Sequence, residues 1–283
     1  MATILALIDG SIYAQSVCDL AAWAATRTSA RVEILHVLGR RETASAPVDL
    51  SGNLDVDERD ELLSELATLD EQRAKLGLRR GRLLLAEAKA RLQAARVADV
   101  STKLRHGDLI ETVQEFEGGA DLVVIGKRGE AADFARGHLG SNLERVVRSS
   151  RKPTLVAARA FRPINRFLIA YDGGASASKA LELVIRDPLF RGLEGEIVAA
   201  GSDSDMQTRL QAAATRLRDA GLSYPTSLVP GYAEEVIGSR VETGGVDLLV
   251  MGAYGHGRLR SLVVGSTTTA MVRRCKIPVL LVR

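Results

Sequence analysis

The sequence predicts an α/β protein that contains two doubly wound domains, each built on a five-stranded parallel sheet. The first observation is a repeated opening, since TILALID (3–9) and RFLIAYD (166–172) are apolar strands that end in Asp followed by Gly. The second is a repeated close, in which ADLVVIGKRG (120–129) corresponds to VDLLVMGAYG (246–255), and RKPTLV (151–156) to KIPVLL (276–281). Matches that recur in the same order indicate an internal duplication.

Within each copy, apolar strands alternate with helical segments, which is typical of a parallel sheet covered on both faces. Right-handed crossovers then produce a doubly wound sheet. The strands expected in the first copy are 3–9, 31–38, 100–106, 121–126 and 154–157. Those expected in the second copy are 167–172, 195–200, 223–228, 246–252 and 278–282. In such sheets ligands bind beyond the carboxyl ends of the strands, where the winding reverses, so strand-end residues are the first candidates for a site.

The duplication divides the chain into a first domain, 1–159, and a second domain, 160–283, joined by a connector that contains Pro163. The first copy carries about 37 more residues between its first Asp-Gly and its glycine loop, mainly between Gly39 and Val100. Leucines recur there among charged residues at roughly helical spacing, which predicts a longer packing helix, or one broken around Gly77 and Gly81.

Composition narrows the class of protein. With 46% hydrophobic and 26% charged residues, the chain is neither disordered nor a disulfide scaffold. The net charge of +3 is spread along the chain, and the few aromatic residues make no base-stacking platform, so we expect no nucleic-acid partner. Cys18 and Cys275 stand alone, far from metal-ligand spacing. No apolar run is long enough for a membrane span or a signal-peptide core, so we expect a cytoplasmic protein.

A glycine loop in the second copy carries the chemistry of an anion site. It runs Gly252-x2-Gly255-x9-Gly265-Ser266-Thr267-Thr268, with glycines just after a buried strand and again where the last helix begins. The first N–H groups of a helix lack intrahelical partners and carry partial positive charge, so a phosphate group fits there. The hydroxyls add donors, and so do His256, Arg258 and Arg260 in the intervening loop.

The same residues have a purely structural reading, because glycine after a strand and Ser or Thr before a helix are ordinary turn and capping chemistry. Asp172 likewise has an alternative as the N-cap of the first helix of its copy. The loop is neither a P-loop, since no Gly-Lys-Ser or Gly-Lys-Thr occurs, nor a dinucleotide fingerprint, since the third glycine is missing.

Taken together, the strand that ends in Asp-Gly, the Gly-x2-Gly-x9-Gly-Ser loop, the helix that follows and the final Pro-Val-Leu-Leu-Val resemble the universal stress protein family. In its tandem form the resemblance covers nearly the whole chain. It implies five-stranded domains of the adenine nucleotide α-hydrolase type, with ATP or a related adenine nucleotide as ligand. It also implies pairing of the two domains through their last strands as a pseudo-dimer, with homodimerisation as a further expectation.

Carried over onto this sequence, the resemblance places Asp172 on the adenine side of a site in the second domain and the hydroxyl residues at the phosphates and ribose. The expected nucleotide-binding residues of the second domain are Asp172, Ala199, Ala200, Met251, Gly252, Tyr254, Gly255, Gly265, Ser266, Thr267 and Thr268. Mg²⁺ recruited by Asp172 and a phosphate would make slow ATP hydrolysis feasible.

The first copy departs from this pattern. Ten residues, not nine, separate Gly129 from Gly140, and Leu143 stands where a hydroxyl is usual. Ser141 and Glu144 also have the spacing of a capping box. The loop cations Lys127, Arg128, Arg136 and His138 are candidates for attracting an anion or for an ordinary solvated face. The candidate nucleotide-binding residues of this domain are Asp9, Val37, Gly126, Gly129, Gly140, Ser141 and Asn142.

The sequence offers no converging catalytic set. His36, His106, His138 and His256 show no metal-ligand spacing, although His36 or His106 is a candidate for lining the cleft of the first copy. Ser11 and Ser176 follow strands without a partner base or a Gly-x-Ser-x-Gly elbow. We therefore expect no catalytic residues and no resident metal. The leading hypothesis is a stress-response protein switched by an adenine nucleotide; the alternatives are a nucleotide-independent interaction protein and, less favoured, an ATP-using enzyme.

Overall fold

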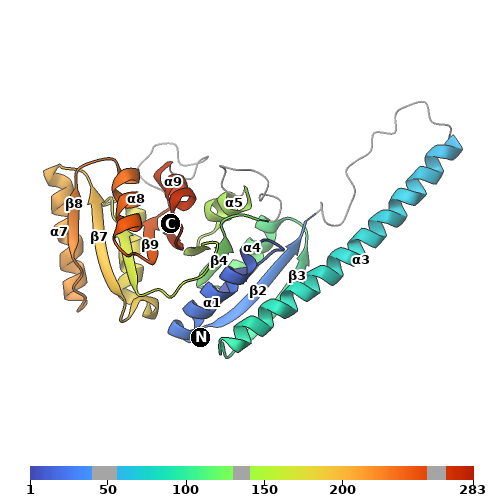
Figure 1. The fold of residues 1–283 in the computed structure, drawn as a ribbon, viewed down its shortest axis with the longest axis horizontal. Helices are drawn as coiled ribbons and strands as arrows, with labels where there is room; N and C mark the ends of the chain where they lie inside the picture. The colour runs from blue at the N-terminus through green and yellow to red at the C-terminus, as the bar shows by residue number, and fades with distance from the viewer. Residues whose placement is uncertain (40–55, 130–140, 254–265) are drawn as a thin grey trace.

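The computed structural model describes residues 1–39, 56–129, 141–253 and 266–283, in which the strands form one ten-stranded sheet with helices on both faces (Figure 1). The strand order is β3-β2-β1-β4-β5-β10-β9-β6-β7-β8. Strands β1 to β5 form the first half and strands β6 to β10 the second, and all strand pairs within a half are parallel. The predicted fold class, two doubly wound five-stranded parallel sheets, is confirmed.

Among the described residues, the two halves contain α-helices and strands in the same order, and the second half has a short 3-10 helix in addition. The first half contains β1 (Thr3–Leu7), α1 (Ala14–Thr28), β2 (Arg31–Leu38), α3 (Val56–Ala94), β3 (Val100–His106), α4 (Leu109–Glu117), β4 (Leu122–Gly126), α5 (Ser141–Ser149) and β5 (Thr154–Ala157). The second contains β6 (Arg166–Ala170), α6 (Ala175–Arg186), the short 3-10 helix η2 (Pro188–Phe190), β7 (Glu194–Ala200), α7 (Ser204–Asp219), β8 (Thr226–Val229), α8 (Ala233–Thr243), β9 (Leu248–Gly252), α9 (Ser266–Arg274) and β10 (Val279–Val282).

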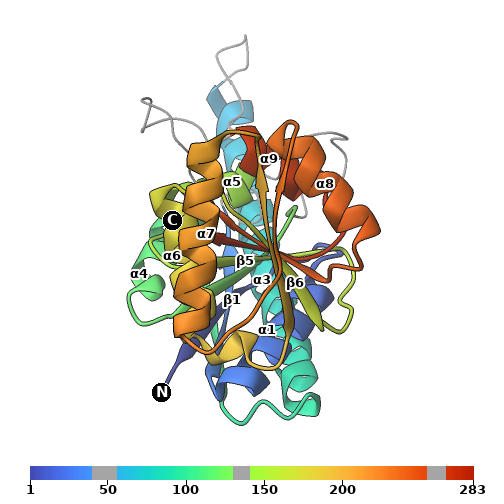
Figure 2. The same cartoon turned by 90° about the vertical axis from the view of Figure 1, so that its left-hand side faces the viewer.

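The halves meet where β5 and β10 pair antiparallel, with Leu155 opposite Leu280. All four residues of each strand are buried, so the junction is part of the core. Viewed from the end, the strands fan out with the twist of a continuous sheet (Figure 2).

Two apolar layers hold the helices to the sheet. One contains the buried faces of α1, α3, α6 and α7, and the other those of α4, α5, α8 and α9. Alternate residues of each strand enter opposite layers, as Ile4 and Leu5 do in β1. This double coverage explains why the strands are almost uninterrupted apolar runs.

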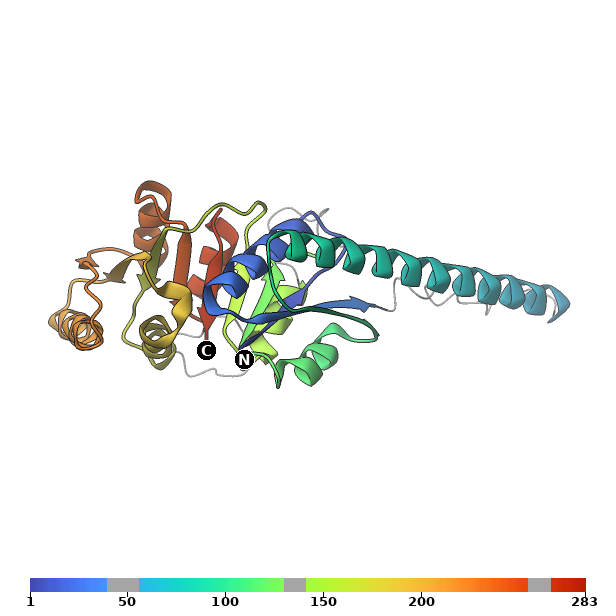
Figure 3. The ribbon, with the colours of Figure 1, turned by 90° about the horizontal axis from the view of Figure 1, so that it is seen from below.

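Helix α3 is a single helix of 39 residues, so of the two expectations for this insertion the unbroken one holds. At 1.5 Å per residue it is about 58 Å long. Gly81 lies where the helix contacts the sheet, and a Cβ there would lie 2.9 Å from Leu104 Cδ1 and 3.0 Å from His36 Cδ2. The glycine therefore permits close packing and does not break the helix. The N-terminal part of α3 projects well beyond the sheet (Figures 1 and 3).

Among the described helices, none has an apolar stretch that would cross a lipid bilayer.

Candidate functional site

The first strand of each half ends in the same turn. The Asp9 carboxylate Oδ1 accepts a hydrogen bond from the Ser11 backbone N–H at 3.0 Å, and Asp172 Oδ1 accepts one from the Gly174 N–H at 2.8 Å. Both turns follow the strands at which the winding reverses, because β1 lies between β2 and β4, and β6 between β7 and β9. Asp172 is not the N-cap of α6, since Gly174 has that position. It shapes the turn that leads into the helix.

Gly252 ends β9 beside the start of α6. A Cβ at this position would lie 2.8 Å from Ser176 Cβ and 2.9 Å from the Ala177 backbone nitrogen. Gly126 has the same relation to the first half, where a Cβ would lie 2.7 Å from Tyr13 Cβ. Both glycines therefore have a packing role: they let the strand end approach the helix that follows the Asp turn.

Thr268 connects the last helix of the second half to this strand end. Its side chain is 3% exposed, and Oγ1 lies 3.3 Å from the carbonyl oxygen of Gly252 and 3.4 Å from that of Ala253. The Thr268 hydroxyl is therefore within hydrogen-bond reach of two carbonyls at the end of β9. Thr268 positions α9 against β9.

Ser266 and Thr267 occupy the first turn of α9 and differ from Thr268 in exposure. Ser266 is exposed and Thr267 partly exposed. The backbone N–H groups of this turn have no intrahelical acceptors, as in any helix. This end of α9 therefore combines hydroxyl and amide donors next to the carboxyl edge of the sheet.

Three further residues that were expected to bind the nucleotide lie on strands and differ in exposure, because successive residues of a strand face opposite sides of the sheet. Ala199 is 1% exposed and packs in the core layer of α6 and α7, whereas Ala200 is partly exposed. Met251 lies on β9 in the opposite core layer and is 5% exposed. Of the two alanines, Ala200 is the one with surface accessible to a ligand.

Four of the expected site residues lie outside the described residues. They are Tyr254, Gly255 and Gly265 in the second half and Gly140 in the first. The loop cations Arg136, His138, His256, Arg258 and Arg260 also lie outside them.

The first half gathers a different set of groups. A Cβ on Gly129 would lie 3.0 Å from Asp9 Oδ2 and 3.8 Å from Asn142 Nδ2, so three predicted site residues meet. The Asp9 carboxylate therefore places negative charge beside the start of the glycine loop of this half. Leu143, which replaces the usual hydroxyl residue, is 3% exposed and packs in the core with α4 and α5. Val37 is partly buried against the same core layer.

Lys127 does not belong to an anion site, contrary to one of the two readings of its loop. It is 8% exposed, and its Nζ donates a hydrogen bond to the backbone carbonyl of Cys275, just after α9 of the other half. Burial lowers the pKa of the Lys127 ammonium to about 8. Burial also raises the pKa of the Cys275 thiol. The sequence alone did not reveal this contact, because the two residues lie 148 positions apart.

Arg209 is a second residue near the candidate site that the sequence did not predict. A Cβ on Gly173, whose φ is +69°, would lie 2.6 Å from Arg209 Cδ, so the α7 side chain covers the turn after Asp172. Its guanidinium pairs with Asp205 at 2.7 Å. In the sequence its only signal is an i, i+4 pairing, which is common on exposed helices.

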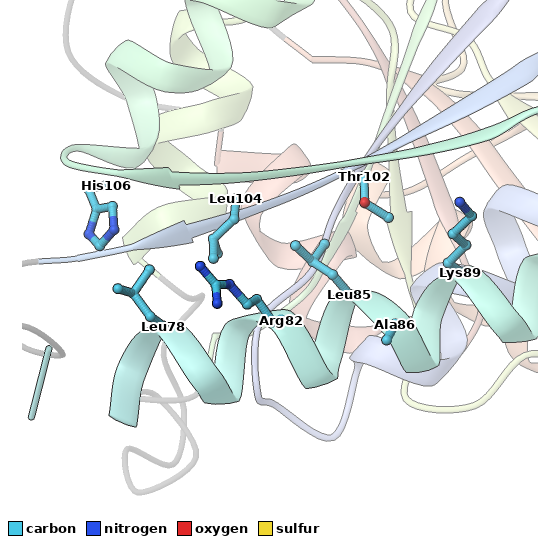
Figure 4. A pocket seen from close by; sticks show the side chains of 8 residues that line it. All are labelled: Leu78, Arg82, Leu85, Ala86, Lys89, Thr102, Leu104 and His106. Carbon is cyan, nitrogen blue, oxygen red and sulfur yellow. The ribbon is translucent and has the colours of Figure 1, made fainter. Parts of the chain in front are cut away.

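The two described histidines that were candidates for the cleft of the first copy lie at different depths. His36 is buried, and its Nδ1 lies 2.9 Å from the Ile8 carbonyl oxygen, so Nδ1 carries the proton. His106 is exposed and lines a hollow of about 500 Å³ between α3 and β3 (Figure 4). The other residues that line it are Leu78, Arg82, Leu85, Ala86, Lys89, Thr102 and Leu104. This hollow lies at the outer edge of the sheet, away from the Asp172 turn.

Among the residues that the structure describes, no group of three or more His, Cys, Asp or Glu side chains is placed to hold a metal ion.

The chain belongs to the universal stress protein family, whose model matches residues 1–158 and 193–283. A universal stress protein of Synechocystis is 39% identical over 287 residues, covering the full length of both chains. One of Mycobacterium tuberculosis is 26% identical over 305 residues, covering 98% of this chain and 95% of the relative. The fold is similar to the crystal structure of a universal stress protein from Archaeoglobus fulgidus, with a TM-score of 0.73, 19% identity, and coverage of 99% and 98% of the two chains.

Proposed function

We propose that this chain is a nucleotide-responsive stress protein of the cytoplasm, in which the second half binds ATP or a related adenine nucleotide. The observation that carries the proposal is the first turn of α9. It brings the Ser266 and Thr267 hydroxyls and the amides of a helix N-terminus to the carboxyl edge of β9, beside the strand where the winding reverses. In the proposed site, phosphates contact this turn, and the base lies toward Asp172, Ala200 and Met251.

The sequence pattern completes the proposed site with Tyr254, Gly255 and Gly265. Thr268 and Gly252 then hold the site together, since the Thr268 hydroxyl joins α9 to the end of β9. Mg²⁺ accompanying the nucleotide would use phosphate oxygens and the Asp172 carboxylate. Any ATP hydrolysis is expected to be slow, because no catalytic group is assigned.

The first half is proposed as the weaker site. Asp9 places a carboxylate beside Gly129, and Lys127 donates its hydrogen bond to the Cys275 carbonyl of the other half. We treat 1–159 and 160–283 as the two functional domains, one specialised for pairing and the other for ligand.

Helix α9 provides a physical route from ligand to domain pairing. Its first turn forms the proposed phosphate site, and the carbonyl just beyond its last turn accepts the hydrogen bond from Lys127 of the other half. A ligand that shifts or orders α9 would therefore act directly on a contact between the halves. This is the proposed regulatory switch.

Isothermal titration calorimetry with Mg²⁺-ATP tests the proposal. Ser266→Glu places a carboxylate at the phosphate position yet suits a helix N-terminus, so it should fold normally and abolish binding. The matched control is Ser141→Glu in the first half, which should leave binding unchanged. One ATP per chain, lost only in Ser266→Glu, supports the assignment. Equal loss in both variants, or no binding by the wild type at millimolar ATP, contradicts it.

A second candidate function is favoured by α3. Its exposed leucines suggest that the chain works as a nucleotide-independent interaction protein. In that case the calorimetry would show no nucleotide binding. Substitution of the exposed leucines of α3 would abolish binding of the partner.

A further inference from the structure

Four leucines of α3 recur at intervals of seven residues: Leu62, Leu69, Leu76 and Leu83. Seven residues are nearly two helical turns, so the four side chains lie along one stripe. Leu69 is 46% exposed, and Leu76 and Leu83 are each 64% exposed. Leu66 lies beside the stripe, one turn after Leu62. Leu62 and Leu66 are partly exposed. A row of leucines that is exposed over most of its length is unusual on a solvated helix.

The stripe lies on the side of α3 that faces away from the sheet. The buried residues of the helix are Gly81, Leu85, Ala88 and Leu92, which pack against the first half. Leu83 and Leu85 are two residues apart, which places them about 200° apart around the helix axis. The helix therefore has two apolar faces, one covered by its own domain and one uncovered among the described residues.

The charge of α3 is divided along its length. Between residues 60 and 71 the charged residues are all acidic: Asp60, Glu61, Glu65, Asp70 and Glu71. Between residues 72 and 94 they are basic apart from Glu87: Arg73, Lys75, Arg79, Arg80, Arg82, Lys89 and Arg91. An antiparallel copy of the same helix would place the acidic part of each chain beside the basic part of the other.

We propose that two copies of this chain associate through antiparallel pairing of their α3 helices along the leucine stripe. Centred at Gln72 and Arg73, the pairing sets Leu62 level with Leu83 of the second copy and Leu69 level with its Leu76. Both contacts occur twice, as a twofold axis requires. The same alignment brings Glu65 level with Arg80 of the second copy and within one residue of its Arg79.

The surroundings of α3 leave room for the α3 helix of a second copy. The acidic part projects beyond the sheet, so a second helix can reach it (Figures 1 and 3). The basic part carries a shallow groove beside Leu83, lined by Lys75, Leu78, Arg79, Arg82 and Ala86. In the antiparallel pair, the acidic end of the second copy lies along this cationic groove. The pairing would join two chains without using the nucleotide site or the β5–β10 junction.

Sedimentation velocity on the full chain tests the proposal. The wild type should form dimers at micromolar concentration, and Leu76→Glu should weaken the dimer on the order of a hundredfold, because it buries a charge against leucine. Ser64→Glu adds the same charge to the opposite face and should leave the dimer intact. Circular dichroism should show unchanged helix content in both variants.

Charge reversal tests the orientation. Glu65→Lys and Arg79→Glu should each weaken self-association, because each places like charges together twice per dimer. An equimolar mixture of the two variants should restore association, since both contacts then join opposite charges. A monomeric wild type, a dimer unaffected by Leu76→Glu, or a mixture that fails to recover overturns the proposal, as does association that occurs only with added nucleic acid or lipid vesicles.

Discussion

Lys127 of the first half donates a hydrogen bond across the domain pairing to the carbonyl of Cys275 in the second. The acceptor lies at the C-terminal end of α9, where unpaired carbonyls and the negative end of the helix dipole favour a cation. Burial opposes the charge and lowers the pKa of Lys127 to about 8. These two effects make the contact sensitive to pH.

We expect Lys127→Met to stabilise the protein at pH 7 by roughly 1–3 kcal/mol, because an apolar side chain of similar length avoids burying a charge. The folded pKa is lower than the ordinary value of 10.5, so the unfolded chain binds the extra proton between about pH 8 and 10.5. Wild-type stability should therefore rise through that window and the advantage of the variant should shrink. Urea unfolding at several pH values measures this, and a constant difference would contradict the buried charge.

Gly252→Ala should destabilise the protein by about 1–3 kcal/mol, because the new methyl group meets Ser176 and the Ala177 backbone at distances below 3 Å. Gly118→Ala is the control, since a Cβ at Gly118 meets nothing within 4 Å. Thermal unfolding of both variants provides the comparison. Equal effects would show that the close packing of β9 on α6 is unimportant.

Glu196 is 2% exposed on β7 and pairs with two arginines, Arg240 at 2.5 Å and Arg166 at 3.4 Å. Glu196→Gln should cost about 2–4 kcal/mol, since it removes the charge that compensates both guanidinium groups. Glu182 also contacts two arginines, Arg186 and Arg216, but is 34% exposed. Glu182→Gln should cost less than about 1 kcal/mol. Denaturant unfolding of the two Glu→Gln variants tests whether burial of the carboxylate, and not the number of arginines that it contacts, sets the cost.

Asp108 caps α4 and also binds Arg145 of α5. Its Oδ1 accepts from the Ile110 N–H at 2.7 Å, and its Oδ2 accepts from Arg145 at 2.8 Å. The hydrogen bond from Arg145 holds the pKa of Asp108 below its ordinary value of 3.8. Asp108→Ala should cost about 1 kcal/mol at pH 7. The part of the wild-type advantage that comes from this charge is complete above the ordinary pKa of 3.8. It should be lost as the pH falls from there through the lower folded pKa, which acid titration of both proteins would reveal.

The duplicated architecture was predictable because each half repeats strong local signals. Apolar runs that end in Asp-Gly, helical spacing and matched closing segments recur in order, and these patterns depend only on neighbouring residues. They predicted ten strands close to the observed positions, with errors of up to three residues at the strand ends, as for 223–228 against Thr226–Val229. They also indicated the Asp172 turn and the start of α9 as candidate site elements.

Three properties depended on tertiary structure. Lys127 and Arg128 are adjacent cations in the sequence, yet only Lys127 is buried, because a segment 148 residues away covers it. Thr268 has the composition of a ligand donor but donates to β9, and Ala199 differs from Ala200 only by the face of the strand. Periodicity predicts which side of an element is apolar. Which group covers that side is set by the packing of distant segments, and that packing decided how far each of the predicted site residues is buried.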